Sequence, residues 1–238
     1  MSMLTVVRHG QASFDSDDYD QLSELGKQQA RQLGKFWADQ QLSVDVVYAG
    51  PRVRQQQTAE LTGISYCLAG FHWPQTVMLQ DLDEYDLHGL FQCFAPRLAA
   101  QNSEFARLQE DYRNSVGRED RLRDFQKMFE CLLHHWQIAD TTDDVESWPA
   151  FRERVARVVR LVQEQSEHKS RAVVFTSGGF IGAVLQQALN VSNQTALELN
   201  WRIRNCSLTE FVFTQGRFSL DSFNMIPHLS DPAMWTYR

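Results

Sequence analysis

Short apolar runs alternate with amphipathic stretches along most of the chain. Residues 4–7 form a β-branched apolar run that stops at Arg8-His9-Gly10, which predicts a buried strand followed by a polar turn. Comparable runs predict further strands at 44–48, 77–79, 171–176, 208–213 and 218–223. Apolar residues at helical spacing predict helices at about 23–37, 52–61, 148–167 and 180–189. Ser23 is expected to cap the first helix, and the acidic stretches 13–20 and 140–144 are expected to be loops.

The order of these elements predicts an α/β fold. Strands and helices alternate over residues 4–79, which is typical of a mostly parallel sheet with helices on both faces, a three-layer α/β/α sandwich. Gln215-Gly216 separates the last two strands and predicts a hairpin. Residues 96–139 show helical spacing and no convincing strand. We therefore expect one domain over residues 1–238, with a helical cap inserted at about 90–145.

Composition narrows the range of partners. The net charge of −7 and the scattered Lys and Arg residues argue against a surface for nucleic acid or for an anionic membrane. The apolar runs are far shorter than the roughly 20 residues of a membrane span. The first residues become charged too early for a secretory leader, so we expect a cytoplasmic protein. The four cysteines form no CxxC pair, which favours reduced structural thiols, and nothing in the pattern indicates an oligomeric state.

The chemistry-bearing residues cluster where predicted strands end. Ligands of parallel α/β sheets bind beyond the carboxyl ends of the strands. Arg8 and His9 follow the first strand, Arg54 lies early in the helix after the second, and Glu84 follows the third. Ser177-Gly178-Gly179 joins the fourth strand to a helix whose N-terminus can receive an anion. Each residue alone would most often be an ordinary polar position. Together they suit phosphoryl transfer.

Several of these segments resemble the motifs of the histidine phosphatase (phosphoglycerate mutase-like) superfamily. Val6-Val7-Arg8-His9-Gly10-Gln11 is similar to its opening signature, and residues 22–30 are similar to its next helix. Residues 54–59 resemble its R-A-x-Q-T-A helix, with Gln55 at the position of the usual Ala. Leu82-Asp83-Glu84 resembles its acid motif, and residues 173–179 resemble its last catalytic strand and turn. Residues 205–208 and His228-Leu229 are also similar, so the resemblance spans nearly the whole chain outside the cap.

The resemblance implies a role for each residue. His9 would be the nucleophile and would carry a phosphohistidine, while Arg8 and Arg54 would bind the phosphoryl oxygens. Glu84 would protonate the leaving oxygen and later activate water, with Asp83 and Asp86 as alternative acids. Ser177 and Gly178 would also contact phosphate. No metal or cofactor is implied, because the arginines supply the positive charge. The substrate would be a phosphorylated small molecule or a phosphoprotein.

One departure from the family pattern bears on activity. The superfamily has a second histidine in a His-Gly-Gly turn, where this chain has Ser177. Loss of one preorganised donor typically costs about 100- to 1,000-fold in turnover. If the missing charge limits turnover, Ser177→His should raise the rate. His88 is a candidate for covering the missing group.

The resemblance predicts a phosphomonoester hydrolase that acts through a phosphohistidine on His9 and that Ser177, in place of the second histidine, would make slow or specialised. The departure at Ser177 also leaves alternatives open. The first is a catalytically silent phosphate-binding relative. A phosphoglycerate-type mutase is less favoured, because it would have to exclude water from its intermediate. A serine hydrolase is also conceivable, because Ser177, Asp221 and His228 follow the chain order of such enzymes. However, Phe175 stands where the first glycine of their nucleophile elbow would be.

Overall fold

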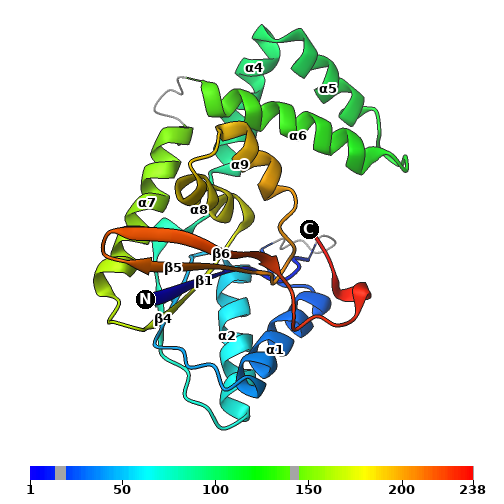
Figure 1. Ribbon diagram of the computed structural model, residues 1–238. Coiled ribbons are helices and arrows are strands. Elements are labelled where there is room, and N and C mark those ends of the chain that lie inside the picture. The colour runs from blue at the N-terminus through cyan, green and yellow to red at the C-terminus, as the bar shows by residue number, and fades with distance from the viewer. Residues whose placement is uncertain (14–19, 140–144, 238) are drawn as a thin grey trace. The chain divides into compact units, whose positions relative to one another are not determined.

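The structure is a computed structural model that describes residues 1–13, 20–139 and 145–237. The predicted loops at 13–20 and 140–144 fall largely or wholly outside these residues. The chain divides into two compact units. One is formed by Met1–Glu84 together with Arg154–Arg238, and the other by Tyr85–Glu153 (Figure 1). The first unit contains all the residues predicted to bind phosphate.

A mixed six-stranded sheet forms the centre of the first unit, with the strand order β3-β2-β4-β1-β5-β6. The strands are β1 (Ser2–Arg8), β2 (Val46–Ala49), β3 (Thr76–Met78), β4 (Arg171–Thr176), β5 (Leu208–Thr214) and β6 (Arg217–Met225). β3, β2, β4 and β1 are mutually parallel. β5 is antiparallel to β1 and forms the predicted hairpin with β6. The α/β fold class is thus confirmed, with its antiparallel part confined to one edge.

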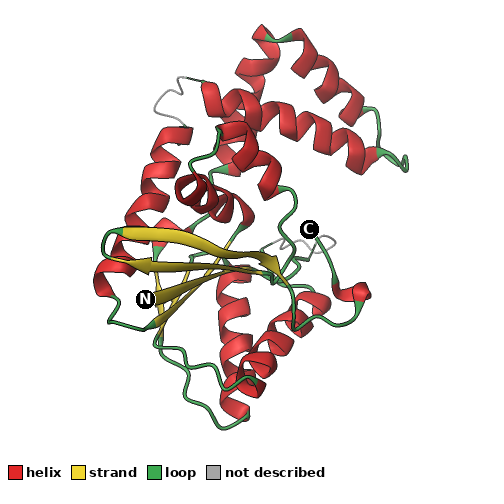
Figure 2. Ribbon diagram, viewed as in Figure 1, coloured by secondary structure: helices red, strands yellow, loops and turns green. Residues whose placement is uncertain are grey.

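The central strands are apolar on both faces because helices cover both sides of the sheet. Val6, Val7, Val173 and Phe175 are almost completely buried, as expected for inner parallel strands. α1 (Glu24–Asp39) and α2 (Val53–Leu68) lie on one face, and α8 (Gly178–Leu189) lies on the other (Figures 1 and 2). β1 pairs with β4 in register, so their carboxyl ends, Arg8 and Thr176, lie side by side. This register brings the turns after both strands to one edge of the sheet.

The helix boundaries follow local signals closely in some places and not in others. Ser23 caps α1 as predicted, because its hydroxyl accepts a hydrogen bond of 3.0 Å from the Gly26 N–H. α2 runs to Leu68, well past the predicted end at 61. α9 (Asn193–Asn200) was not predicted, because its sequence is mostly polar. Two short 3-10 turns, Gln80–Leu82 and Pro232–Met234, complete the first unit together with the second half of α7 (Trp148–Gln165).

All the regular elements among the described residues of the second unit are helices. It comprises α3 (Leu87–Gly89), a π-helical turn (Leu90–Phe94), α4 (Ala95–Gln101), α5 (Ser103–Arg113), α6 (Arg121–Ile138) and the start of α7. Aromatic side chains hold it together. Trp136 packs edge-on against Trp148 at 5.3 Å between ring centroids, and Phe91 stacks on Phe129 at 5.6 Å. The unit extends from 85 to 153, whereas the sequence pattern suggested a cap at about 90–145. None of the helices described in either unit has the length and apolar character needed to cross a membrane.

Candidate active site

The ends of β1 and β4 bring together the two turns that the sequence singled out. The His9 N–H donates to the Thr176 carbonyl at 2.9 Å, which continues the strand pairing by one residue. Ser177 follows as the N-cap residue of α8, and Gly178 is the first residue of that helix. The imidazole of His9 therefore leaves the sheet beside a helix N-terminus, where backbone N–H groups favour an anion.

The His9 ring is held in one tautomer. Its Nδ1 lies 2.7 Å from the Gly10 carbonyl oxygen, which can only accept, so Nδ1 carries the proton. Its Nε2 then has a lone pair, which accepts a 3.2 Å hydrogen bond from Nε of Arg54. Burial lowers the pKa of His9 well below 6.5, and the nearby charges of Arg54 and Arg8 lower it further. The ring is thus neutral at pH 7, with its unprotonated nitrogen facing Arg54.

The backbone around His9 is fixed from several directions. Its carbonyl accepts hydrogen bonds from the Cys206 N–H at 3.2 Å and from the Asn205 side-chain amide at 3.3 Å. Cys206 has a φ of 57°, a left-handed conformation that is uncommon for a residue with a side chain. Gly10 packs so closely against α1 that a Cβ there would lie 2.6 Å from the Gly26 carbonyl oxygen. These contacts leave the turn after β1 little freedom to move.

Arg54 is the second residue of α2 and is almost fully buried. One of its terminal nitrogens donates to Asp20 at 2.7 Å. The other carboxylate oxygen of Asp20 accepts from the Val53 N–H at 2.8 Å, so Asp20 caps the start of α2 and positions Arg54 together. Asp20 was not among the predicted site residues, because it lies in a stretch that the sequence marks only as an acidic loop.

Arg8 lies along the N-terminus of α8. One of its terminal nitrogens donates to the Ile203 carbonyl. A Cβ built on Gly178 would lie 3.7 Å from Nε of Arg8 and 2.5 Å from the Asn200 side-chain oxygen. A side chain at position 178 would therefore have to displace the side chain of Asn200. The absence of a Cβ leaves room for the backbone of the helix N-terminus beside the guanidinium.

Among the three candidate acids, Glu84 is the one that reaches the helix N-terminus. Its Oε2 accepts a 3.0 Å hydrogen bond from the Gly179 N–H. Asp83 instead pairs with Arg52 at 2.6 Å. Asp86, in the helical unit, accepts from the Gly89 N–H at 2.9 Å. In these contacts, Glu84 is thus the carboxylate that lies at the start of α8, beside the turn after β4.

Arg154 supports the turn that carries Glu84, and sequence reasoning missed it. Its guanidinium donates to the carbonyls of Asp81 at 3.0 Å, Asp83 at 2.8 Å and Glu84 at 3.3 Å. It comes from α7, some 70 positions away in the sequence. No local pattern marks it, because the apolar face of α7 predicts only a helix. Hydrogen bonds from one charged guanidinium to three carbonyl groups fix the conformation of this turn.

Ser177 is fully buried, and its hydroxyl oxygen accepts a 2.8 Å hydrogen bond from the amide nitrogen of Gln55. The serine-hydrolase arrangement is not assembled among these residues. Asp221 is exposed on β6, at the edge of the sheet, and His228 packs beside Phe36 of α1 at 6.3 Å between ring centroids. His88 is exposed in the helical unit. The described contacts of Ser177 thus point to Gln55 and not to a histidine.

Comparison of the sequence with known protein families identifies the family of this chain. The sequence profile of the histidine phosphatase superfamily (branch 1) matches residues 4–86 and 91–226. The chain belongs to the histidine phosphatase superfamily. No curated protein matches the chain as an individual relative.

Solved structures of similar fold include members of more than one activity. A phosphoglycerate mutase from Bacillus anthracis str. Sterne is 16% identical with a TM-score of 0.63, and the match covers 96% of this chain and 95% of that one. A phosphoserine phosphatase from Entamoeba histolytica is 17% identical with a TM-score of 0.61, covering 96% and 100%. An alpha-ribazole phosphatase from Shigella flexneri is 19% identical with a TM-score of 0.59, covering 94% and 96%. At these identities the likeness establishes the fold of the superfamily alone.

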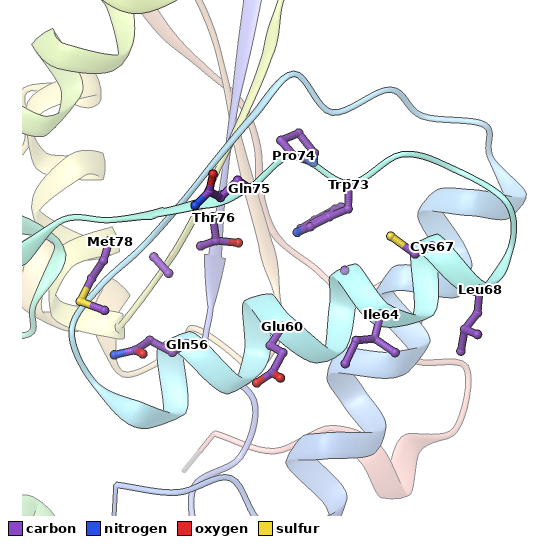
Figure 3. Close-up of a pocket in the computed structure, with 12 residues that line it drawn as sticks. Gln56, Glu60, Ile64, Cys67, Leu68, Trp73, Pro74, Gln75, Thr76 and Met78 are labelled. Carbon is purple, nitrogen blue, oxygen red and sulfur yellow. The ribbon is translucent and has the colours of Figure 1, made fainter.

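The structure also has a groove of about 710 Å³, and none of the candidate site residues is part of its lining (Figure 3). It runs between α2 and the segment that leads into β3, and Trp73, Ile64 and Met78 give it an apolar lining. Glu60 is its charged residue, and no basic side chain contributes to its lining. A phosphate group would find no positive charge there, so the superfamily site at the strand ends remains the candidate active site.

Proposed function

We propose that the chain hydrolyses phosphomonoesters through a phosphohistidine on Nε2 of His9. One observation carries the proposal: a buried, neutral imidazole beside a helix N-terminus directs its unprotonated nitrogen at Arg54, with the charge of Arg8 nearby. A neutral ring is needed because only the unprotonated nitrogen can attack phosphorus. The arginines supply the charge that stabilises the transferring phosphoryl group.

The first step joins His9 to phosphorus and breaks the ester bond. As the bond between Nε2 and phosphorus forms, Arg8 and Arg54 bind the equatorial oxygens and replace the present contact between Arg54 and His9. The N-terminus of α8 at Gly178 and the hydroxyl of Ser177 contribute further donors. The protonated Glu84 gives its proton to the departing ester oxygen, so the product leaves as an alcohol.

The second step returns the enzyme to its starting state. A water molecule attacks phosphorus while Glu84 takes its proton, the bond to Nε2 breaks, and inorganic phosphate is released. His9 is again neutral, with its Nδ1 proton still directed at the Gly10 carbonyl. Because the arginines neutralise the charge, we expect the activity to need no added metal. We expect a phosphorylated small molecule as substrate, since the similar structures include phosphatases named for phosphoserine and alpha-ribazole.

A phosphate-binding protein without turnover is the second candidate. Ser177 favours it, because a buried hydroxyl hydrogen-bonded to Gln55 carries no positive charge toward the phosphoryl group. Such a protein would use the same arginines and the same helix N-terminus. It would differ only in failing to form or to hydrolyse the phosphohistidine.

Hydrolysis of p-nitrophenyl phosphate beside p-nitrophenyl acetate, without added metal, separates these functions. The variants are the wild type, His9→Ala and, as a control, the exposed His72→Ala. Phosphate release that His9→Ala abolishes and His72→Ala leaves intact is the expected result. Phosphate binding without release would favour the silent relative. Acetate release that survives in His9→Ala would overturn the proposal and point to Ser177.

A further inference from the structure

Gln55 and Ser177 are two buried polar residues that meet in the site although 122 positions separate them. Both side chains are fully shielded from solvent. They are also the two positions at which we noted departures from the motifs of the superfamily. A buried polar pair needs complementary partners, because an unsatisfied group in such a place is costly. The hydrogen bond between Gln55 and Ser177 gives each group such a partner.

The orientation of the Gln55 amide is determined by its other contacts. Its oxygen accepts from the Arg52 N–H at 3.1 Å, and an N–H can only donate. Its nitrogen lies 2.8 Å from the Ser177 hydroxyl oxygen and 3.4 Å from the Leu82 carbonyl oxygen, which can only accept. The amide nitrogen therefore donates to Ser177. Since the serine oxygen accepts this hydrogen bond, its own proton is available for a different acceptor.

Gly50 provides the space for this arrangement. A Cβ at Gly50 would lie 2.1 Å from the amide oxygen of Gln55 and 2.9 Å from the Leu82 carbonyl oxygen. The long side chain of Gln55 thus fills the volume between Gly50 and the short side chain of Ser177. A larger residue at position 177 would meet the amide of Gln55, which lies 2.8 Å from the serine oxygen.

We propose that Gln55 is a positioning residue whose amide sets the hydroxyl of Ser177 as a hydrogen-bond donor to a phosphoryl oxygen. The two side chains then act as one unit at the phosphate site. This inference rests on the proposed function for the location of the phosphoryl group. It requires phosphate binding at that location, but it does not require turnover.

A double-mutant cycle on the affinity for inorganic phosphate tests whether Gln55 and Ser177 act together. Gln55→Ala and Ser177→Ala are each expected to weaken phosphate binding about 10-fold, the typical effect of one hydrogen bond to a charged group. The double variant should bind no more weakly than the weaker single variant, because both changes remove the same interaction. Gln56→Ala is the matched control: its side chain donates to Pro51 and lines the groove on the other face of α2.

Two further variants separate positioning from mere packing. Gln55→Glu keeps the shape but replaces the amide donor by an acceptor, so the serine proton is drawn away from phosphate and affinity should fall as in Gln55→Ala. Ser177→His alone should lose affinity, because Gln55 occupies the space that the imidazole needs. Gln55→Ala combined with Ser177→His should recover affinity above either single variant.

The outcomes distinguish this inference from the proposed function. The coupling between Gln55 and Ser177 is overturned if the double variant loses the product of the two single losses of phosphate affinity. Unchanged phosphate affinity in Gln55→Glu overturns it as well. Both results would do so even if His9-dependent hydrolysis is observed. A double variant that loses no more phosphate affinity than the weaker single variant supports the coupling between Gln55 and Ser177, even if the wild type hydrolyses nothing. A wild type that binds no phosphate overturns both.

Discussion

The buried imidazole of His228 should make the protein sensitive to mild acid. His228 lies in the segment after β6 and is largely buried beside Phe36. Burial lowers its pKa from 6.5 to about 4. That difference means that protonation costs the folded state about 3.4 kcal/mol more than the unfolded state.

The sign follows from proton counting. Between pH 6.5 and pH 4 the unfolded chain binds the proton and the folded chain does not, so stability falls as pH falls through this window. Above pH 6.5 both states are neutral and the effect vanishes. From these two pKa values, the loss attributable to His228 between pH 7 and pH 5 is about 1.8 kcal/mol.

Urea unfolding at pH 7 and pH 5 measures this loss. His228→Gln removes the titrating ring, so its free energy of unfolding should fall by about 1.8 kcal/mol less over the interval than that of the wild type. His168→Gln, at an exposed position, is the control and should behave like the wild type. Groups that the three proteins share cancel in the comparison. An equal fall in the wild type and in His228→Gln would refute the reasoning.

Three further predictions concern the active site. The NMR titration of His9 should show its ring neutral well below pH 6.5, since burial and Arg54 lower its pKa; a midpoint at or above 6.5 would show that burial and the arginines do not lower this pKa. Asp20→Asn should tighten binding of inorganic phosphate about 3- to 10-fold, because it removes a negative charge 2.7 Å from Arg54, and unchanged or weaker binding would show that Asp20 serves mainly to hold the arginine. Arg154→Met should lower kcat for p-nitrophenyl phosphate about 10- to 100-fold by releasing the turn that carries Glu84, while phosphate affinity should change little. An equal loss of affinity in Arg154→Met would place Arg154 in phosphate binding instead.

Local signals in the sequence account for most of the sheet and for part of the site. β1 and β4 are short apolar runs that end in polar turns, and this signal needs no tertiary information. Arg8 and His9 could be predicted for the same reason. The end of α2 could not, because buried polar residues such as Thr62 and Ser65 interrupt its apolar pattern. Its hidden face packs against α1 through small and polar side chains.

The supporting contacts of the site leave no comparable local trace. Gln55 stood out only as a mismatch to a motif, and Ser177 stood out as another. Their hydrogen bond joins segments 122 positions apart, so it depends on how the sheet brings α2 and the β4 turn together. Arg154 likewise acts on carbonyl groups, which every residue possesses and which carry no sequence signature.

The central position of β1 has a consequence for how the protein folds in the cell. Thr5 pairs with Val173 on one side and with Glu210 on the other, so both neighbours of β1 are made long after it. At about 5–20 residues per second, roughly 10 to 30 s of synthesis separate β1 from β4. During that time an apolar strand has both edges unpaired, which is a hazard for aggregation. We therefore expect nascent chains that stop short of β4 to need chaperone protection and to lack any affinity for phosphate.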